Sequence, residues 1–190
     1  MPMVRSMKRR GVLLLEMILL CIAGAAGQSQ QPTKPPAKQQ AASATIDTST
    51  WKTYRNEKYG FEVKYPDTWT VQSSSGTGPD IIHLRGPVRA GEPGVYVALA
   101  IQKDQNPKRL SIDKWFADQL QATKSSPESS GHLTIGGQAA IFMENTNSFG
   151  KNRGTFTVLN ETDILSFSYV RRSEVDSTYA AIVSSFRVVK

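Results

Sequence analysis

The sequence predicts an α+β domain in which a largely antiparallel sheet carries two main helices. From residue 51 onward, short segments with strand-like alternation are separated mostly by gaps of hairpin length. Two longer segments, 111–124 and 173–186, instead repeat their apolar residues at helical spacing. The order along the chain is therefore strands, helix, strands, helix, which is typical of a sheet with helices packed on it.

The first predicted strand is half-buried. Phe61, Val63 and Tyr65 alternate with polar neighbours, and the following Pro66-Asp67 pair predicts a turn. Further strands in this half are predicted at three places: from Trp69, at 81–84 and at 95–101. The last segment is apolar at every position, so we expect a central strand that is covered on both faces. Loops are expected at two stretches rich in Ser, Gly and Pro: 73–79 and 86–94.

The first predicted helix follows Ser111, a residue type that caps helix N-termini. One face of this helix is apolar and consists of Ile112, Trp115, Phe116 and Leu120. The second predicted helix opens with a segment that resembles a capping box, 173–176. Its apolar face consists of Val175, Tyr179, Ile182, Val183 and Phe186. The final residues, 186–189, either end this helix or extend as a short tail.

Three more strands are predicted between the helices, at about 139–144, 155–159 and 164–170. Turns are expected at Gly136-Gly137 and at 160–163, and a hairpin loop at 150–154. His132 follows a Ser-Ser-Gly sequence and is expected in a loop.

The first fifty residues are expected to lie outside the fold. Residues 1–27 are typical of a secretory signal peptide, with a basic start, an apolar run broken only by Glu16, and small residues at the end. An uncleaved anchor and a lipoprotein attached at Cys21 are the alternatives, although Leu20 is large for the residue preceding a lipidated cysteine. Residues 28–50 form a predicted disordered linker rich in Gln, Pro and Ala, and the globular domain is 51–190.

The net charge of +7 first suggests a polyanionic partner. Residues 1–50 hold six basic and two acidic residues (+4), whereas 51–190 hold 17 basic and 14 acidic residues (+3). More than half of the excess charge therefore belongs to the signal and linker. The basic residues of the domain are not interleaved with exposed aromatic residues in the predicted elements, so we expect no nucleic-acid binding.

No sequence pattern in the chain indicates catalysis. The sequence lacks a Gly-rich phosphate loop and a nucleophile elbow. Asp80 is expected on the opposite strand face from His83, so it would not orient that histidine as in a catalytic triad. One cysteine and two histidines, His83 and His132, give no ligand spacing for a metal. We therefore predict no enzyme, no catalytic residue, no metal site and no cofactor.

The segment Tyr59-Gly60-Phe61-Glu62-Val63-Lys64-Tyr65-Pro66-Asp67-Thr68-Trp69 resembles the opening motif of PsbP-like proteins. The closing segment 179–186 resembles the C-terminal helix of the same group. This resemblance covers roughly 51–190 and implies an α/β/α sandwich with a central antiparallel sheet. It also implies a binding or assembly role without catalysis, with the motif residues in structural positions.

The predicted function is that of an exported, non-catalytic accessory domain of the cell envelope, periplasmic or extracellular, that binds a protein partner. Its candidate surface residues are His83, Arg85 and Arg89. The alternative is a small-ligand-binding protein or hydrolase with its site under the loops 73–79 and 86–94, which flank one strand.

Overall fold

The computed structural model describes residues 46–189 except 75–77, 89 and 91–93. The predicted signal peptide, Cys21, most of the linker and Arg89 lie outside the described residues. The two helices are α1 (Ile112–Thr123) and α2 (Ser173–Ser184). The strands, in chain order, are β1 (Lys52–Asn56), β2 (Phe61–Tyr65), β3 (Thr70–Ser74), β4 (Asp80–Arg85), β5 (Tyr96–Gln102), β6 (Ser129–Ile135), β7 (Gln138–Asn147), β8 (Gly150–Leu159), β9 (Asp163–Val170) and β10 (Arg187–Val188).

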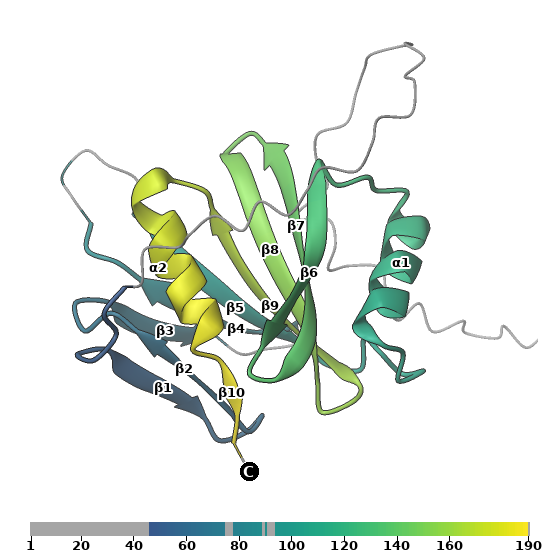
Figure 1. The fold of residues 1–190 in the computed structure, drawn as a ribbon, viewed down its shortest axis with the longest axis horizontal. Coiled ribbons are helices and arrows are strands. Elements are labelled where there is room, and N and C mark those ends of the chain that lie inside the picture. The colour runs from purple at the N-terminus through teal and green to yellow at the C-terminus, as the bar shows by residue number, and fades with distance from the viewer. Residues whose placement is uncertain (1–45, 75–77, 89, 91–93, 190) are drawn as a thin grey trace, which may run out of the picture.

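A seven-stranded sheet forms the centre of the molecule, in the order β3-β4-β5-β9-β8-β7-β6. Every strand pair in it is antiparallel, which confirms the predicted α+β class (Figure 1). A second sheet, β1-β2-β10, was not predicted as a separate layer. It forms because β2 pairs with β1 on one side and with the last residues of the chain on the other.

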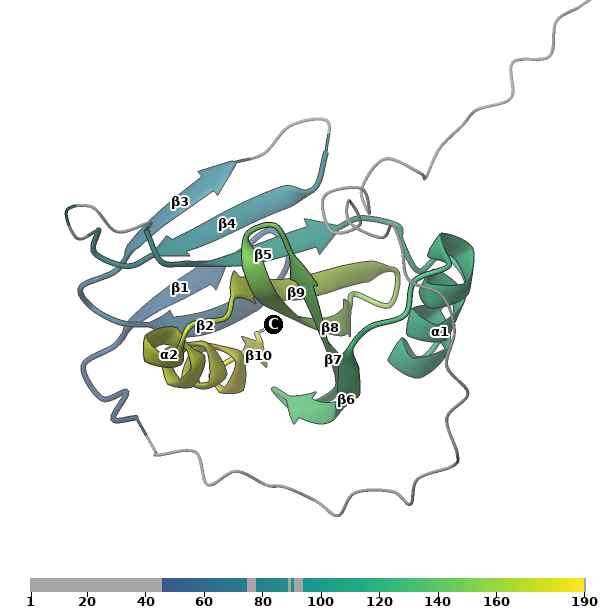
Figure 2. The ribbon, with the colours of Figure 1, turned by 90° about the horizontal axis from the view of Figure 1, so that it is seen from above.

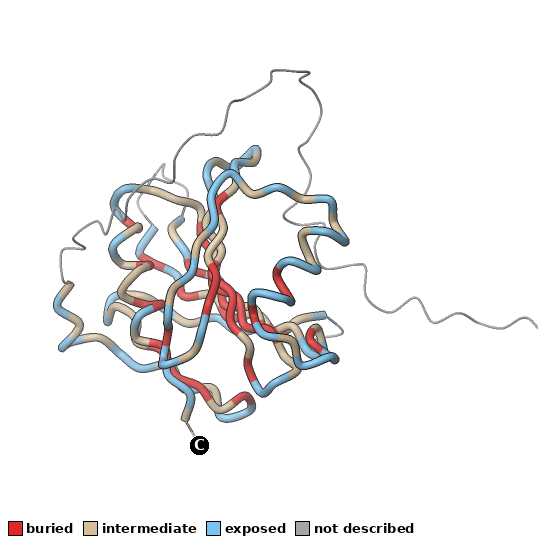
Figure 3. The backbone as a smooth tube through the Cα atoms, turned by 45° about the vertical axis from the view of Figure 1, so that its right-hand side comes forward, coloured by how far each residue is buried: buried red, intermediate tan, exposed pale blue. Residues whose placement is uncertain are grey.

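The helices lie on opposite sides of the large sheet (Figures 1 and 2). On one side, α2 and the small sheet share a core with the large sheet, centred on the fully buried Phe61, Phe167 and Phe186. On the other side, Trp115 and Phe116 of α1 pack on Phe156. Figure 3 shows the buried residues gathered along the central strands and on the inner sides of both helices.

The cap of α1 is as predicted, because the Ser111 hydroxyl accepts a hydrogen bond from the Lys114 backbone N–H at 3.4 Å. The predicted capping box of α2 is wrong. Arg172 is the N-cap residue and makes no side-chain cap bond, and Ser173 is the first helical residue. The structural reason is that Asp176 accepts hydrogen bonds from Tyr169 and Arg171 instead.

Three strands of the structure were not predicted from the sequence: β1, β6 and β10. His132 lies on β6 rather than in a loop, and all seven residues of β6 pair with β7 across the Gly136-Gly137 turn. That turn is confirmed, with φ angles of +54° and +79°. The predicted hairpin loop at 150–154 is wrong, since these residues begin β8 and the turn lies at 147–150.

Strand β5 also differs from its prediction in one respect that matters for function. It occupies an interior place in the sheet, as expected, but only alternate residues are buried: Val97, Leu99 and Ile101. Tyr96, at its start, is 41% exposed. The sheet face on which Tyr96 lies is therefore open to solvent around this residue. The helix that packs on the large sheet away from Tyr96, α1, does so on β7 and β8.

Candidate functional site

Strand β4 places two of the predicted surface residues on one sheet face. Successive strand residues point to opposite sides, so His83 and Arg85 share a face, while Asp80, Ile82 and Leu84 face the core. Both meet Tyr96 of the neighbouring strand. The His83 and Tyr96 rings meet edge-on with centroids 5.6 Å apart, and the Arg85 guanidinium carbon lies 6.0 Å from the Tyr96 centroid.

His83 is partly buried beneath this contact. Its Nδ1 atom is inaccessible to solvent and has no hydrogen-bond partner among the described residues. Burial, and secondarily the positive charge of Arg85, lowers the pKa of His83 below its ordinary value of 6.5. The imidazole is therefore neutral at pH 7, which lets it pack against Tyr96 as an aromatic ring.

Asp80 cannot serve as an orienting carboxylate for His83. It lies on the opposite face, as expected, where it accepts hydrogen bonds from Lys58 and from Tyr59, each at 2.6 Å. The hydrogen bonds from Lys58 and Tyr59 lower the pKa of Asp80. This carboxylate holds the turn before β2 against β4 and has a structural role.

A cleft of about 250 Å³ opens next to Tyr96. Its lining comes from three parts of the chain: the start of β5, the β7–β8 turn and the connection from β9 to α2. The residues are Gly94, Val95, Tyr96, Phe149, Val170 and Arg172. Two aromatic rings thus border an apolar cleft that also contains a guanidinium group.

Large apolar side chains are exposed around this cleft. Phe149 is 81% exposed and Val88 is 73% exposed, whereas a folded domain normally buries most of the area of such residues. Val88 lies beside the cleft, because a Cβ atom built on Gly94 would approach its Cγ2 to 3.4 Å. We call Arg85, Val88, Tyr96, Phe149, Val170 and Arg172 the Tyr96 surface.

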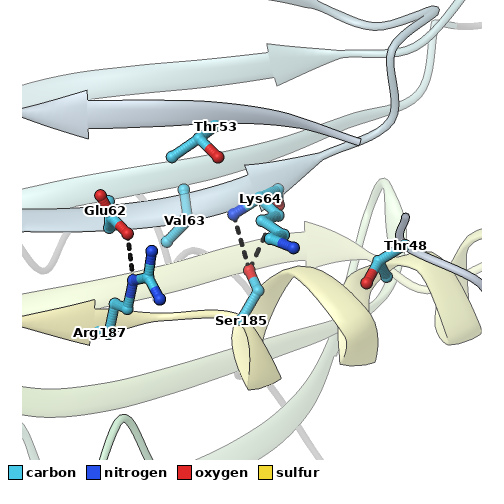
Figure 4. Close-up of a pocket in the computed structure, with 7 residues that line it drawn as sticks. All are labelled: Thr48, Thr53, Glu62, Val63, Lys64, Ser185 and Arg187. Carbon is cyan, nitrogen blue, oxygen red and sulfur yellow. Dashed lines mark hydrogen bonds and ion pairs between the residues drawn. The ribbon is translucent and has the colours of Figure 1, made fainter. Parts of the chain in front are cut away.

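A second cavity, of about 180 Å³, lies between β2 and the end of α2 (Figure 4). Several of its polar groups are already paired with each other. Glu62 forms an ion pair with Arg187, and the Ser185 hydroxyl accepts from the Lys64 backbone N–H at 2.7 Å. These bonds join the small sheet to α2, so this cavity is a structural junction.

A charge cluster lies on the core-side face, at the β7–β8 end of the sheet. The Glu144 side chain is only 7% exposed and meets Lys151, Arg153 and Arg171 at 2.9–3.2 Å. Burial raises the pKa of the neighbouring Asp176, but hydrogen bonds from Arg171 and Tyr169 outweigh it and leave that pKa below its ordinary value. Every carboxylate here is neutralised by a cation, so the cluster stabilises the fold rather than forming a reactive site.

Neither metal binding nor membrane spanning is indicated within 46–189, apart from the undescribed gaps. No group of three or more His, Cys, Asp or Glu side chains there has the arrangement to hold a metal ion. The helices of this part of the chain are too short or too polar to cross a membrane.

The order of the strands does not allow the loops 73–79 and 86–94 to cover one pocket together, as was expected. These loops leave β4 at opposite ends, since one precedes Asp80 and the other follows Arg85. A six-residue strand separates their described ends by roughly 17–20 Å. Among the described residues of the two loops, only Gly94 of the second loop lines the cleft, next to Val95 at the start of the following segment.

Five of the six residues of the Tyr96 surface were not predicted from the sequence: Val88, Tyr96, Phe149, Val170 and Arg172. Two of them, Tyr96 and Phe149, carried a signal that could have been used. Tyr96 was included in an apolar run that was expected to be buried, although tyrosine is intermediate in burial between apolar and polar residues. Phe149 lies in the polar turn Asn147-Ser148-Phe149-Gly150. A large aromatic residue in a polar turn has no core to enter, and this was the available signal.

No family model and no curated protein matches the chain. Among solved structures, it is similar to cyanobacterial PsbP from Synechocystis, with 16% identity, 75% of this chain and 95% of that chain covered, and a TM-score of 0.49. It is also similar to a Bacteroides thetaiotaomicron protein, with 11% identity, coverage of 74% and 49%, and a TM-score of 0.46. A Pseudomonas aeruginosa protein of unknown function, described as a putative regulator, matches with 16% identity, coverage of 66% and 85%, and a TM-score of 0.38.

The chain thus spans about half the length of the Bacteroides protein. The opening motif predicts a resemblance to PsbP-like proteins, and cyanobacterial PsbP is among the solved structures to which this chain is similar. The motif residues lie where that resemblance implies: Gly60 has a φ of +64° in the turn before β2, and Phe61 is fully buried. Tyr65 and Trp69 are partly buried against the same core.

Proposed function

We propose that this chain is an exported, non-catalytic domain of the cell envelope that binds a protein partner through the Tyr96 surface. The observation that carries the proposal is the exposure of Phe149, Val88 and Tyr96 around one cleft. Exposed apolar residues that gather at one place on a domain are typical of an interaction site, whereas single ones are ordinary.

The composition of the surface favours a protein as the partner. Aromatic residues and arginine are enriched at the centres of protein interfaces, and here Tyr96 and Phe149 lie beside Arg85 and Arg172. Arg85 contacts Tyr96 and forms no ion pair within the described part of the chain. We therefore expect the partner to present an apolar side chain to the cleft and a carboxylate to Arg85.

Export is supported by the predicted signal peptide at 1–27, and the predicted linker at 28–50 would hold the domain away from a membrane or signal end.

The test is capture of envelope proteins by the purified chain, followed by direct binding of the captured protein in purified form. We expect Phe149→Ser and Tyr96→Ser to weaken binding by more than about tenfold each, because large aromatic residues at interface centres contribute more than about 1.4 kcal/mol. Val188→Ser is the matched control, since Val188 is also 41% exposed but lies on β10. Equal binding by all variants would exclude the Tyr96 surface.

The cleft itself supports a second candidate, a small ligand bound beside Tyr96. Its volume of about 250 Å³ is slightly below the usual range of ligand pockets, roughly 300–1,000 Å³. A ligand that binds only the folded state must raise the melting temperature. A panel of aromatic carboxylates tests this candidate, and no shift at millimolar concentration would count against it.

A further inference from the structure

The large sheet ends at β6, a strand of seven residues, Ser129–Ile135. It pairs with β7 along its whole length, and no strand in the described part of the chain pairs with its other side. One row of its backbone N–H and C=O groups therefore faces away from the sheet. Such a row is a template for pairing with another strand.

Proteins usually protect an edge of this kind with charged residues or proline. The edge strand of the small sheet, β1, contains Lys52 and Arg55. Strand β6 has the sequence SSGHLTI, which contains no Lys, Arg, Asp, Glu or Pro. The other edge of the large sheet, β3, is also uncharged but has only five residues.

The residue sizes along β6 make this strand complementary to itself. Small residues fill its first half and larger residues its second half. When two copies pair antiparallel about His132, each large residue meets a small one: Leu133 meets Gly131, Thr134 meets Ser130, and Ile135 meets Ser129. We propose that two copies of this chain associate through β6 and extend the antiparallel sheet across the dimer axis.

The core-side face of the sheet supports this register. The Phe142 ring already lies over Gly131, because a Cβ atom there would come within 2.6 Å of its Cε1. This ring occupies the space above the glycine and offers an apolar edge to Leu133 of the second copy. Leu133 is itself only partly buried against the core, so pairing would remove more of it from water.

The opposite face brings the two His132 side chains together at the axis. Each His132 Nε2 is held 2.7 Å from Oδ1 of Asp113, at the start of α1. The imidazole therefore has its partner within its own chain. Ser130 and Thr134 meet on the same face, and cross-strand Ser–Thr pairs stabilise antiparallel strands.

A single strand pairing buries less area than the roughly 1,000 Å² typical of a stable interface. We therefore expect a weak dimer with a dissociation constant between about 10 and 500 μM. This association uses a different strand from the Tyr96 surface, so it stands or fails independently of the proposed function.

Sedimentation velocity of the purified chain, from roughly 5 to 1,000 μM, tests the proposal. We expect the native chain to shift from monomer to dimer across this range. Ser130→Lys combined with Thr134→Lys places two Lys–Lys pairs across the axis, so this variant should remain monomeric. The corresponding double Glu variant should behave in the same way.

Mixing the Lys and Glu variants should restore a dimer that contains one copy of each, because every opposed pair then has opposite charges. This restoration also shows that both variants are folded. Gln121→Lys, on the exposed side of α1, is the control and should dimerise like the native chain. A native chain that is monomeric throughout the range overturns the proposal, and so do like-charged variants that dimerise as well as the native chain.

Discussion

The imidazole of His83 meets the ring of Tyr96 edge-on, with centroids 5.6 Å apart. This contact links a partly buried side chain within the sheet to the exposed margin of the cleft. Arg85, two residues further along the same face of β4, reaches the same Tyr96 ring. A ring held by two neighbours loses little conformational freedom on binding, which favours Tyr96 as an anchor for a partner.

The lowered pKa of His83 predicts a pH-dependent stability. In the unfolded chain, His83 takes up a proton as the pH falls below about 6.5, whereas in the folded chain burial resists that proton. The free energy of unfolding is therefore unaffected by His83 above about pH 7. It declines as the pH falls from there toward the lower folded-state pKa, because the unfolded chain binds the proton more readily. Urea unfolding measured between pH 5 and 8 should show this decline in the native chain.

His83→Leu removes the titrating group and should flatten this part of the pH profile. The matched variant is His132→Leu, which removes the exposed histidine of β6 and should leave the His83 decline in place. If both variants keep the native profile, His83 is not the group responsible.

Tyr179 connects α2 to the middle of the sheet. Its hydroxyl donates to Thr155 Oγ1 at 2.8 Å and also lies 3.2 Å from the Phe167 carbonyl oxygen, and both side chains are buried. Tyr179→Phe leaves a buried hydroxyl without this partner and should cost about 1–3 kcal/mol in the free energy of unfolding. Adding Thr155→Val removes the orphaned hydroxyl, so the double variant should be less destabilised than the sum of the two single variants. Additive costs would mean that the bond contributes nothing.

Buried and exposed ion pairs should differ in their contribution to stability. Glu144→Gln leaves Lys151, Arg153 and Arg171 around an uncharged side chain that is nearly buried, and should destabilise the fold by about 3–5 kcal/mol. Glu161→Gln breaks an ion pair with Arg109 in which both side chains are about 70% exposed, and should cost less than about 1 kcal/mol. Equal costs in chemical denaturation would contradict a buried charge cluster.

The Gly136-Gly137 turn supplies a prediction with an internal control. Both residues have positive φ, so alanine is strained at either position. A Cβ atom on Gly136 would also come within 2.7 Å of the Phe186 carbonyl oxygen, whereas one on Gly137 would meet nothing within 4 Å. Gly136→Ala should therefore lower the melting temperature clearly more than Gly137→Ala. Similar losses would show that strain alone acts at this turn.

The sequence allowed prediction of the elements that have a strong periodic pattern. Both helices, the antiparallel sheet and the alternation of β4 follow from apolar spacing that the core preserves. Strand β6 was missed because Ser129, Ser130 and Gly131 have low strand propensity, and its pairing depends on β7 through the Gly136-Gly137 turn. Strand β10 has two residues and exists only because β2 offers a free edge.

The candidate surface could be predicted only in part. His83 and Arg85 were identified from β4 alone, but their common neighbour Tyr96 comes from another strand. Phe149 and Arg172 join the cleft from segments that are more than fifty residues away in sequence. Such a surface depends on sheet order, which the local spacing of residues does not determine.

Site-specific photocrosslinking tests the Tyr96 surface most directly. A photoreactive phenylalanine analogue replaces Phe149, which is 81% exposed, and in a control replaces Val188, which is 41% exposed on β10. We expect position 149 to crosslink in the native envelope to one discrete protein species. We expect Tyr96→Ser to reduce this product, and position 188 not to form it. Equal crosslinking from both positions, or none from position 149, would show that the Tyr96 surface does not bind a partner.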